Sequence, residues 1–124
     1  MLNRLANAGN PYQGDAKKVL CVCSAGLLRS PSAAWVLSQE PFNFNTRAAG
    51  ISTEYALIPV DKVLVHWADE IVCMEAAHAR HIEKAFEKEL EGKKLVVLAV
   101  PDRYKRLDPE LIQIIKTQYE ETTK

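Results

Sequence analysis

Residues 18–31 read KVLCVCSAGLLRSP. The apolar run VLCVC predicts a buried strand over residues 19–23, which ends abruptly at the small residues SAG. The pair Ser30-Pro31 predicts the start of a helix, because proline is tolerated at the first helical position, where a backbone N–H has no partner. We therefore expect a strand, a short loop and a helix in direct succession.

The rest of the sequence repeats this alternation of strand and helix. Apolar or β-branched runs predict further strands over residues 45–49, 70–74 and 94–100. Helical spacing and capping signals predict helices over residues 59–67, from 76 to about 90, and from 109 to about 121. This order predicts an α/β fold, a three-layer sandwich with a four-stranded parallel sheet flanked by helices on both faces. The ligand site of such a fold lies at the carboxyl ends of the strands.

Length and charge limit the classes of function. The chain has 124 residues, enough for one core, and we expect an N-terminal arm or edge segment over residues 1–16 and a single α/β domain over residues 17–124. Sixteen Lys and Arg residues balance sixteen Asp and Glu residues, which disfavours nucleic-acid binding. The sequence shows neither a run long enough to cross a bilayer nor a secretory signal, so we expect a cytoplasmic protein with no membrane partner. It leaves the oligomeric state open.

The loop after the first strand carries one thiol, Cys23, and one guanidinium, Arg29. Inward-pointing backbone N–H groups and the start of the following helix form a site for a tetrahedral oxyanion, and an arginine adds a two-pronged contact. The same positive field stabilises a thiolate, which predicts that Cys23 is a nucleophile. The other residues that we expect to surround the anion are Ser24, Ala25, Gly26, Leu27, Leu28 and Ser30.

This strand, C-x5-R-S loop and helix resemble the low-molecular-weight protein tyrosine phosphatases and the related arsenate reductases, whose pattern is C-x-G-N-x-x-R-S. The resemblance implies that Cys23 attacks phosphorus, that Arg29 binds the phosphoryl oxygens, and that Ser30 donates a hydrogen bond that keeps the sulfur ionised. Two positions depart from the pattern. Ala25 stands where the family has Gly, and Gly26 stands where it has an Asn that braces the loop.

A phosphatase of this kind also needs a carboxylic acid to protonate the leaving oxygen. Asp102 follows the fourth strand in VPDRY, which is similar to the VPDPY segment of the family. The resemblance implies that Asp102 is the general acid and that Tyr104 lies at the pocket rim. Asp108 is the alternative acid, but D-P-E before an amphipathic run predicts a helix N-cap at this position.

The remaining cysteines and the histidines receive no catalytic role. We expect Cys21 and Cys73 to pack in the core, with a resolving thiol as the alternative for Cys73. Three cysteines are too few for a disulfide framework and fit a reducing compartment. The histidines show no metal-ligand pattern, so we expect them on the surface and predict neither a metal nor a cofactor. They are His66, His78 and His81.

Together these features predict a metal-free phosphomonoester hydrolase, a cysteine-dependent phosphatase that works through a phosphocysteine intermediate. The expected partner is a phosphorylated substrate, either a phosphotyrosine protein or a small aryl phosphate. Two alternatives stay open: a phosphocysteine carrier that resembles the IIB components of the phosphotransferase system, and a non-catalytic domain that binds phosphate or a phosphoprotein. Arsenate reduction coupled to thioredoxin would require cysteines beyond Cys73, and the sequence has none.

Overall fold

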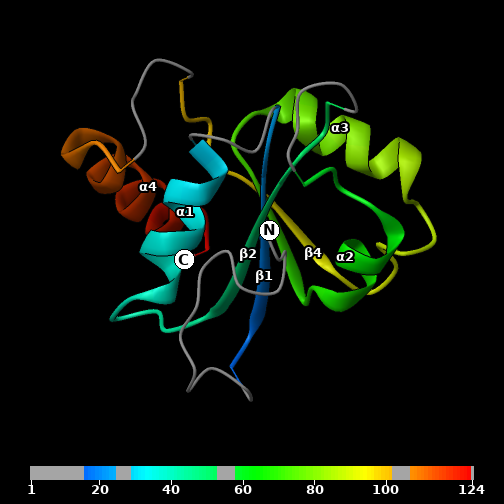
Figure 1. Ribbon diagram of the computed structural model, residues 1–124, viewed down its shortest axis with the longest axis horizontal. Helices are drawn as coiled ribbons and strands as arrows, with labels where there is room; N and C mark the ends of the chain where they lie inside the picture. Colours follow the sequence, from blue (N-terminus) through cyan, green and yellow to red (C-terminus); the bar gives the residue numbers. More distant parts are fainter. Residues whose placement is uncertain (1–15, 25–28, 53–57, 102–106, 124) are drawn as a thin grey trace.

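The computed structural model describes residues 16–24, 29–52, 58–101 and 107–123, and in them strands and helices alternate along the chain (Figure 1). The strands are β1 (Lys18–Cys23), β2 (Asn45–Gly50), β3 (Glu70–Cys73) and β4 (Lys94–Val97). The helices are α1 (Arg29–Ser38), α2 (Lys62–Trp67), α3 (Ala76–Ala85) and α4 (Pro109–Thr122). The predicted α/β class is therefore confirmed.

The four strands form one parallel sheet in the order β2-β1-β3-β4. In β1, Val22 lies opposite Ala49 of β2 on one side and Cys73 of β3 on the other. The chain passes from β1 to β2 and then crosses to β3 on the far side of β1, so the direction of winding changes between β1 and β3. Ligands of open α/β sheets bind at the carboxyl ends of the strands beside such a point.

Helices cover both faces of the sheet, with α1 and α4 on one face and α2 and α3 on the other (Figure 1). Successive side chains of a strand point to opposite faces. In β1, Val19, Cys21 and Cys23 accordingly belong to the core shared with α1 and α4, whereas Leu20 and Val22 belong to the core shared with α2 and α3. The expected three-layer sandwich is confirmed.

The fourth strand is shorter and less buried than the sequence predicts. It ends at Val97 instead of Val100, because Ala99 has a φ of 56°, which is incompatible with an extended strand. The backbone still follows β3, since the N–H of Val100 donates to the carbonyl of Met74 at 2.8 Å. β4 is an edge strand of the sheet, and its Leu95 is only half-buried. The helices therefore do not cover this strand completely on both faces.

The helices add two observations, one on length and one on burial. The third ends at Ala85 instead of continuing to Leu90, because Phe86 leaves the helical region with a φ of −130°. Two large apolar side chains are exposed: Trp35 is 43% exposed on α1, and Val63 is 64% exposed in the first turn of α2. Small and aliphatic neighbours occupy the sheet-facing positions of both helices instead.

The predicted arm lies outside the described residues except for Ala16, so the boundary between residues 16 and 17 stays a prediction. Within the described ranges, no helix has the length and apolar character that a bilayer crossing requires.

Candidate active site

Cys23 is the last residue of β1 and lies at the carboxyl end of the sheet. Its carbonyl oxygen accepts a hydrogen bond from the N–H of Ile51 at 3.0 Å, which holds it against the end of β2. The first residues of α1 return to the same place, and Sγ of Cys23 lies 3.1 Å from Oγ of Ser30. The predicted succession of strand, loop and helix thus places a hydroxyl beside the thiol.

Arg29, the first residue of α1, is buried with only 2% of its surface exposed. Its Nη1 donates to the carbonyl of Val100 at 3.0 Å and to the carboxylate of Glu75, with which it forms an ion pair. The hydrogen bond and the positive charge of Arg29 hold the pKa of Glu75 below its usual range, so the carboxylate is charged at neutral pH. A residue immediately before α3 therefore orients the guanidinium.

His78 is buried, with 2% of its surface exposed, so the expected surface position is wrong. It occupies the third position of α3, where its Nδ1 accepts the backbone N–H of the N-cap residue Glu75 at 3.1 Å. Its Nε2 lies 3.1 Å from Oγ of Ser24, the residue after the thiol. An amide N–H can only donate, so Nδ1 carries no hydrogen, the neutral ring carries its hydrogen on Nε2, and Nε2 donates to Ser24.

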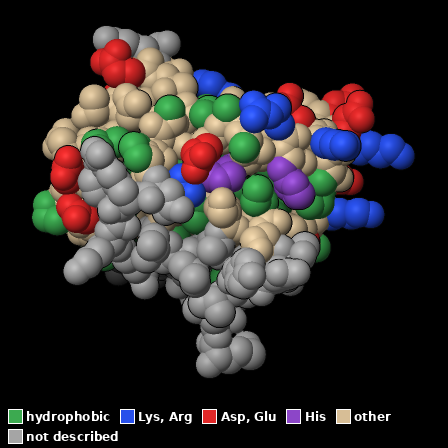
Figure 2. Space-filling view, turned by 90° about the horizontal axis from the view of Figure 1, so that it is seen from above, with side chains coloured by type: hydrophobic (Ala, Val, Ile, Leu, Met, Phe, Trp, Pro, Cys, Tyr) green, Lys and Arg blue, Asp and Glu red, His purple; other side chains and the backbone are tan. Residues whose placement is uncertain are grey.

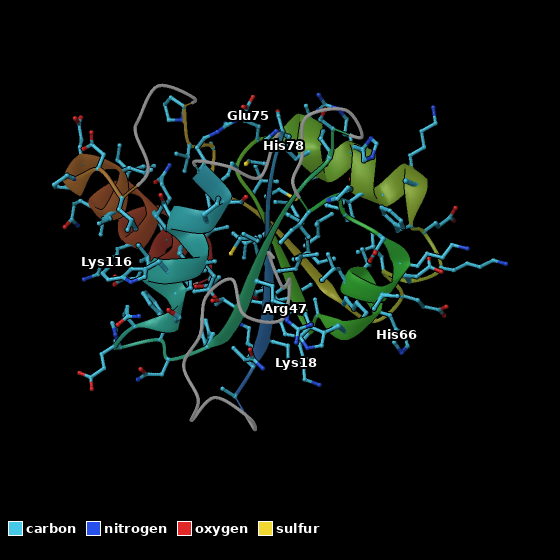
Figure 3. All side chains as sticks on the ribbon, viewed as in Figure 1. Lys18, Arg47, His66, Glu75, His78 and Lys116 are labelled. Atoms are coloured by element: carbon cyan, nitrogen blue, oxygen red, sulfur yellow. The ribbon has the colours of Figure 1, made fainter. Side chains whose placement is uncertain are left out.

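These residues come from separate segments that meet at one end of the sheet. Figure 2 shows histidine, acidic and basic side chains adjoining one another on the surface at this end. Figure 3 places Glu75 and His78 at the start of α3, whereas Lys18, Arg47 and His66 lie at the opposite end of the sheet. The basic side chains of that opposite end do not belong to the site.

Several predicted site residues lie outside the described residues, so their roles stay predictions. They are Ala25, Gly26, Leu27, Leu28, Asp102 and Tyr104. The described residue Val100 accepts from Arg29, and the predicted acid follows two positions later in the chain. Asp108 caps α4 as expected, since its carboxylate accepts the N–H of Glu110 at 2.9 Å.

The other two cysteines are buried, as predicted. Burial raises the pKa of Cys73 to about 12 and raises that of Cys21 as well, so both thiols are neutral at physiological pH. Cys73 packs in the core under α2 and α3, whereas Cys23 packs on the opposite face of the sheet. This placement does not support Cys73 as a resolving thiol. The described part of the chain contains no group of three or more side chains that could hold a metal ion.

Solved structures share this architecture. Wzb from Vibrio vulnificus, in complex with benzylphosphonate, has a TM-score of 0.66 and 19% identity over 85% of this chain and 95% of its own. The low molecular weight protein tyrosine phosphatase from Streptococcus pyogenes has a TM-score of 0.66 and 16% identity, over 85% of this chain and 89% of its own. The chain has the low-molecular-weight phosphatase fold. The resemblance seen in the sequence is therefore confirmed at the level of the fold.

The same phosphatase fold occurs in the YwlE arginine phosphatase from Geobacillus stearothermophilus, with a TM-score of 0.55 and 20% identity over 85% of this chain and 84% of that one. No protein-family model matches the sequence, and no curated protein does. Fold similarity at these identities leaves the chemistry to be argued from the residues of the site.

Sequence reasoning missed Glu75 and His78. A signal was present, because both follow the third strand at the edge of the sheet where the ligand site was expected. The absence of a metal-ligand pattern among the histidines instead favoured a surface position for His78. Only the packing of α3 against the end of β1 reveals that the imidazole faces Ser24.

Proposed function

We propose that this protein is a metal-free phosphomonoester hydrolase, a cysteine-dependent phosphatase that works through a phosphocysteine intermediate. The observation that carries the proposal is the arrangement of Cys23, Ser30 and Arg29. A thiol, a hydroxyl 3.1 Å from it and a buried guanidinium meet at the carboxyl ends of the strands, beside the start of α1. The phosphatase fold of the chain supports the same chemistry.

In the first step, the thiolate of Cys23 attacks phosphorus and the bond from phosphorus to the leaving oxygen breaks. A proton passes to that oxygen from the carboxylic acid of Asp102, which becomes a carboxylate. The products are the free alcohol and a phosphocysteine. The guanidinium of Arg29 and the N-terminal end of α1 stabilise the charge on the phosphoryl oxygens in the transition state.

In the second step, water attacks phosphorus and gives its proton to the carboxylate of Asp102. The bond between sulfur and phosphorus breaks, inorganic phosphate leaves, and Cys23 returns as a thiolate. Ser30 assists here by donating its hydroxyl hydrogen to the departing sulfur, from which it lies 3.1 Å away. Atoms and charge balance over the two steps without a redox partner.

For the substrate we propose an aryl phosphate, as phosphotyrosine in a protein or as a small molecule. One of the similar structures was solved with benzylphosphonate, and another is an arginine phosphatase, so phosphoarginine belongs in any test of specificity. We also propose a cytoplasmic location. The three cysteines are buried and form no disulfide, which fits a reducing compartment.

Hydrolysis of p-nitrophenyl phosphate by protein treated with EDTA tests the proposal. We expect turnover in the wild type, its loss in Cys23→Ser, and its retention in Cys21→Ala, because Cys21 is a neutral core thiol. Mass spectrometry should detect a transient phosphate adduct on Cys23. Full turnover in Cys23→Ser would overturn the mechanism, and a long-lived adduct without hydrolysis would favour the carrier alternative.

The natural class of substrate is identified by comparing kcat/KM for phosphotyrosine peptides, alkyl phosphates and phosphoarginine. We expect the phosphotyrosine peptide to be the best of these substrates. Preference for phosphoarginine would keep the cysteine mechanism and replace the proposed substrate class.

A further inference from the structure

The loop that follows Cys23 has few side chains with which to hold its own shape. Between Ser24 and Arg29 the sequence is AGLL, and none of these four side chains carries a hydrogen-bonding group. The polar side chains of this segment stand only at its two ends. Anchoring through the hydrogen bonds of the segment's own side chains must therefore act at those ends.

Both ends of the loop are bonded to the first turn of α3. At the beginning of the loop, Oγ of Ser24 lies 3.1 Å from Nε2 of His78. At the other end, Arg29 forms an ion pair with Glu75, the N-cap residue of α3. Glu75 and His78 are in turn bonded to each other, because Nδ1 of the imidazole accepts the backbone N–H of Glu75. One helical turn thus contacts the loop immediately before and after its apolar part.

The backbone of Ser24 is held from a second direction. Its carbonyl oxygen accepts the N–H of Ser52 at 2.9 Å, in the segment that follows β2. The hydroxyl of Ser24 is directed toward α3 on the other side of β1. With its carbonyl bonded to one segment and its side chain to another, Ser24 has a fixed orientation at the point where the anion-binding loop begins.

We propose that His78 is a positioning residue for the loop between Cys23 and Arg29. Its neutral Nε2–H tautomer fixes the orientation of Ser24, while Glu75 fixes that of Arg29. The inference rests on the proposed function, because it assigns the role of this turn in that same site. The assigned role is positioning and not catalysis, because the imidazole is hydrogen-bonded to Ser24 and to the backbone of Glu75, which lie beside the loop. A misplacement of the loop relative to a bound phosphate would lower both binding and turnover.

Three substitutions of His78 separate positioning from simple packing. In His78→Gln, the side-chain oxygen can accept the N–H of Glu75 as in a capping box, and the amide nitrogen can still donate to Ser24. In His78→Glu the cap acceptor remains but the donor is lost. His78→Phe fills the buried space without either hydrogen bond. The matched control is His81→Phe, because His81 is exposed on the same helix one turn later.

Two measurements apply to each variant, and neither needs turnover. One is the rate at which iodoacetate alkylates Cys23 near neutral pH, and the other is the concentration of inorganic phosphate that protects it. We expect His78→Phe and His78→Glu to require about 10-fold to 100-fold more phosphate for protection. His78→Gln and His81→Phe should stay close to the wild type. Equal protection in the wild type and His78→Phe would overturn the proposal, as would equal damage in the Phe and Gln variants.

Should His78→Phe fail to fold, Ser24→Ala removes the same hydrogen bond at an exposed residue without changing the core. We expect the same loss of phosphate protection, and the double variant with His78→Glu should be no worse than Ser24→Ala alone, because the two residues share one bond. An additive loss would overturn the proposal. A wild type that binds phosphate but hydrolyses no ester would refute the proposed function and leave this test intact.

The tautomer is measured directly by nitrogen NMR of the His78 ring in the wild-type protein. We expect the hydrogen on Nε2 and a bare Nδ1 at neutral pH. A hydrogen on Nδ1 would overturn the proposal, because it would abolish the bond from the N–H of Glu75.

Discussion

Ser30 has one hydroxyl hydrogen and lies close to two acceptors: Sγ of Cys23 at 3.1 Å and the carbonyl oxygen of Ala49 at 3.2 Å. When Cys23 is a neutral thiol, its S–H can donate to Ser30 while Ser30 donates to Ala49. When Cys23 is a thiolate it has no hydrogen to give, so the hydroxyl must turn and donate to sulfur. Ionisation of the nucleophile is therefore coupled to rotation of a buried hydroxyl.

We predict that Ser30→Ala slows both the formation and the release of phosphate on Cys23. A hydrogen bond to a charged group contributes about 1.5–3 kcal/mol, which corresponds to roughly a 10-fold to 100-fold loss of reactivity toward iodoacetate at neutral pH. Rapid-quench kinetics should show the phosphocysteine accumulating, since the departing sulfur loses its donor. Ser30→Thr keeps the hydroxyl and serves as the control. Unchanged alkylation in Ser30→Ala would show that the hydroxyl does not stabilise the thiolate.

We predict that Arg29→Lys is severely damaging although it keeps the charge. An ammonium lacks the planar guanidinium, whose Nη1 contacts both Val100 and Glu75 and thereby orients the fork for the phosphoryl oxygens. A misplaced cation costs about 10²-fold in kcat/KM. Steady-state kinetics with p-nitrophenyl phosphate measure the loss. Arg80→Lys, at an exposed position of α3, should have no effect. If Arg29→Lys retained most of its activity, another group would have to hold the phosphoryl oxygens.

We predict that Asp102→Asn slows the hydrolysis of alkyl and poorly activated aryl phosphates by about 10²–10⁴-fold. Good leaving groups such as p-nitrophenolate need no proton, so they should be affected much less. The dependence of kcat/KM on the pKa of the leaving group is the measurement that reports this difference.

Asp108→Asn is the matched control for Asp102→Asn. It should lower the free energy of unfolding by at most about 1 kcal/mol, because Asn also accepts the N–H of Glu110 at the start of α4. Its leaving-group dependence should equal that of the wild type. If Asp108→Asn changed the leaving-group dependence and Asp102→Asn did not, Asp108 would be the general acid.

We predict that the protein loses stability at alkaline pH partly through Cys73. Its thiol has a pKa of about 12 in the folded state, because of burial, and about 8.5 in an unfolded chain. A pKa raised by folding contributes stability that is complete below pH ~8.5 and is lost as the pH rises toward 12, because only the unfolded state ionises there. Urea unfolding should show a shallower loss over this interval in Cys73→Ala. If the free energy of unfolding fell equally steeply with pH in the wild type and in Cys73→Ala, Cys73 would not contribute to the loss of stability.

The local order of the chain could be predicted from the sequence. The signals used act within a few residues: a β-branched run before small residues, a Ser-Pro pair and a D-P-E cap. They were sufficient for the strand that ends at Cys23, the helix that carries Ser30 and the cap at Asp108. Helix length was less predictable. The end of α3 at Ala85 depends on one backbone torsion at Phe86, for which the sequence carries no strong signal.

What the sequence alone determined was therefore the order of elements and the residues brought to the carboxyl end of β1. The tertiary structure decided which residues support them. Ser24 and His78 are 54 positions apart, and Arg29 and Glu75 are 46 apart, yet each pair is hydrogen-bonded. Neither contact has a local signal, because each exists only when β3 pairs with β1 in parallel register and the start of α3 reaches the loop. Periodicity reports which face of a helix is buried, but the partner of a buried polar group is determined by the strand order.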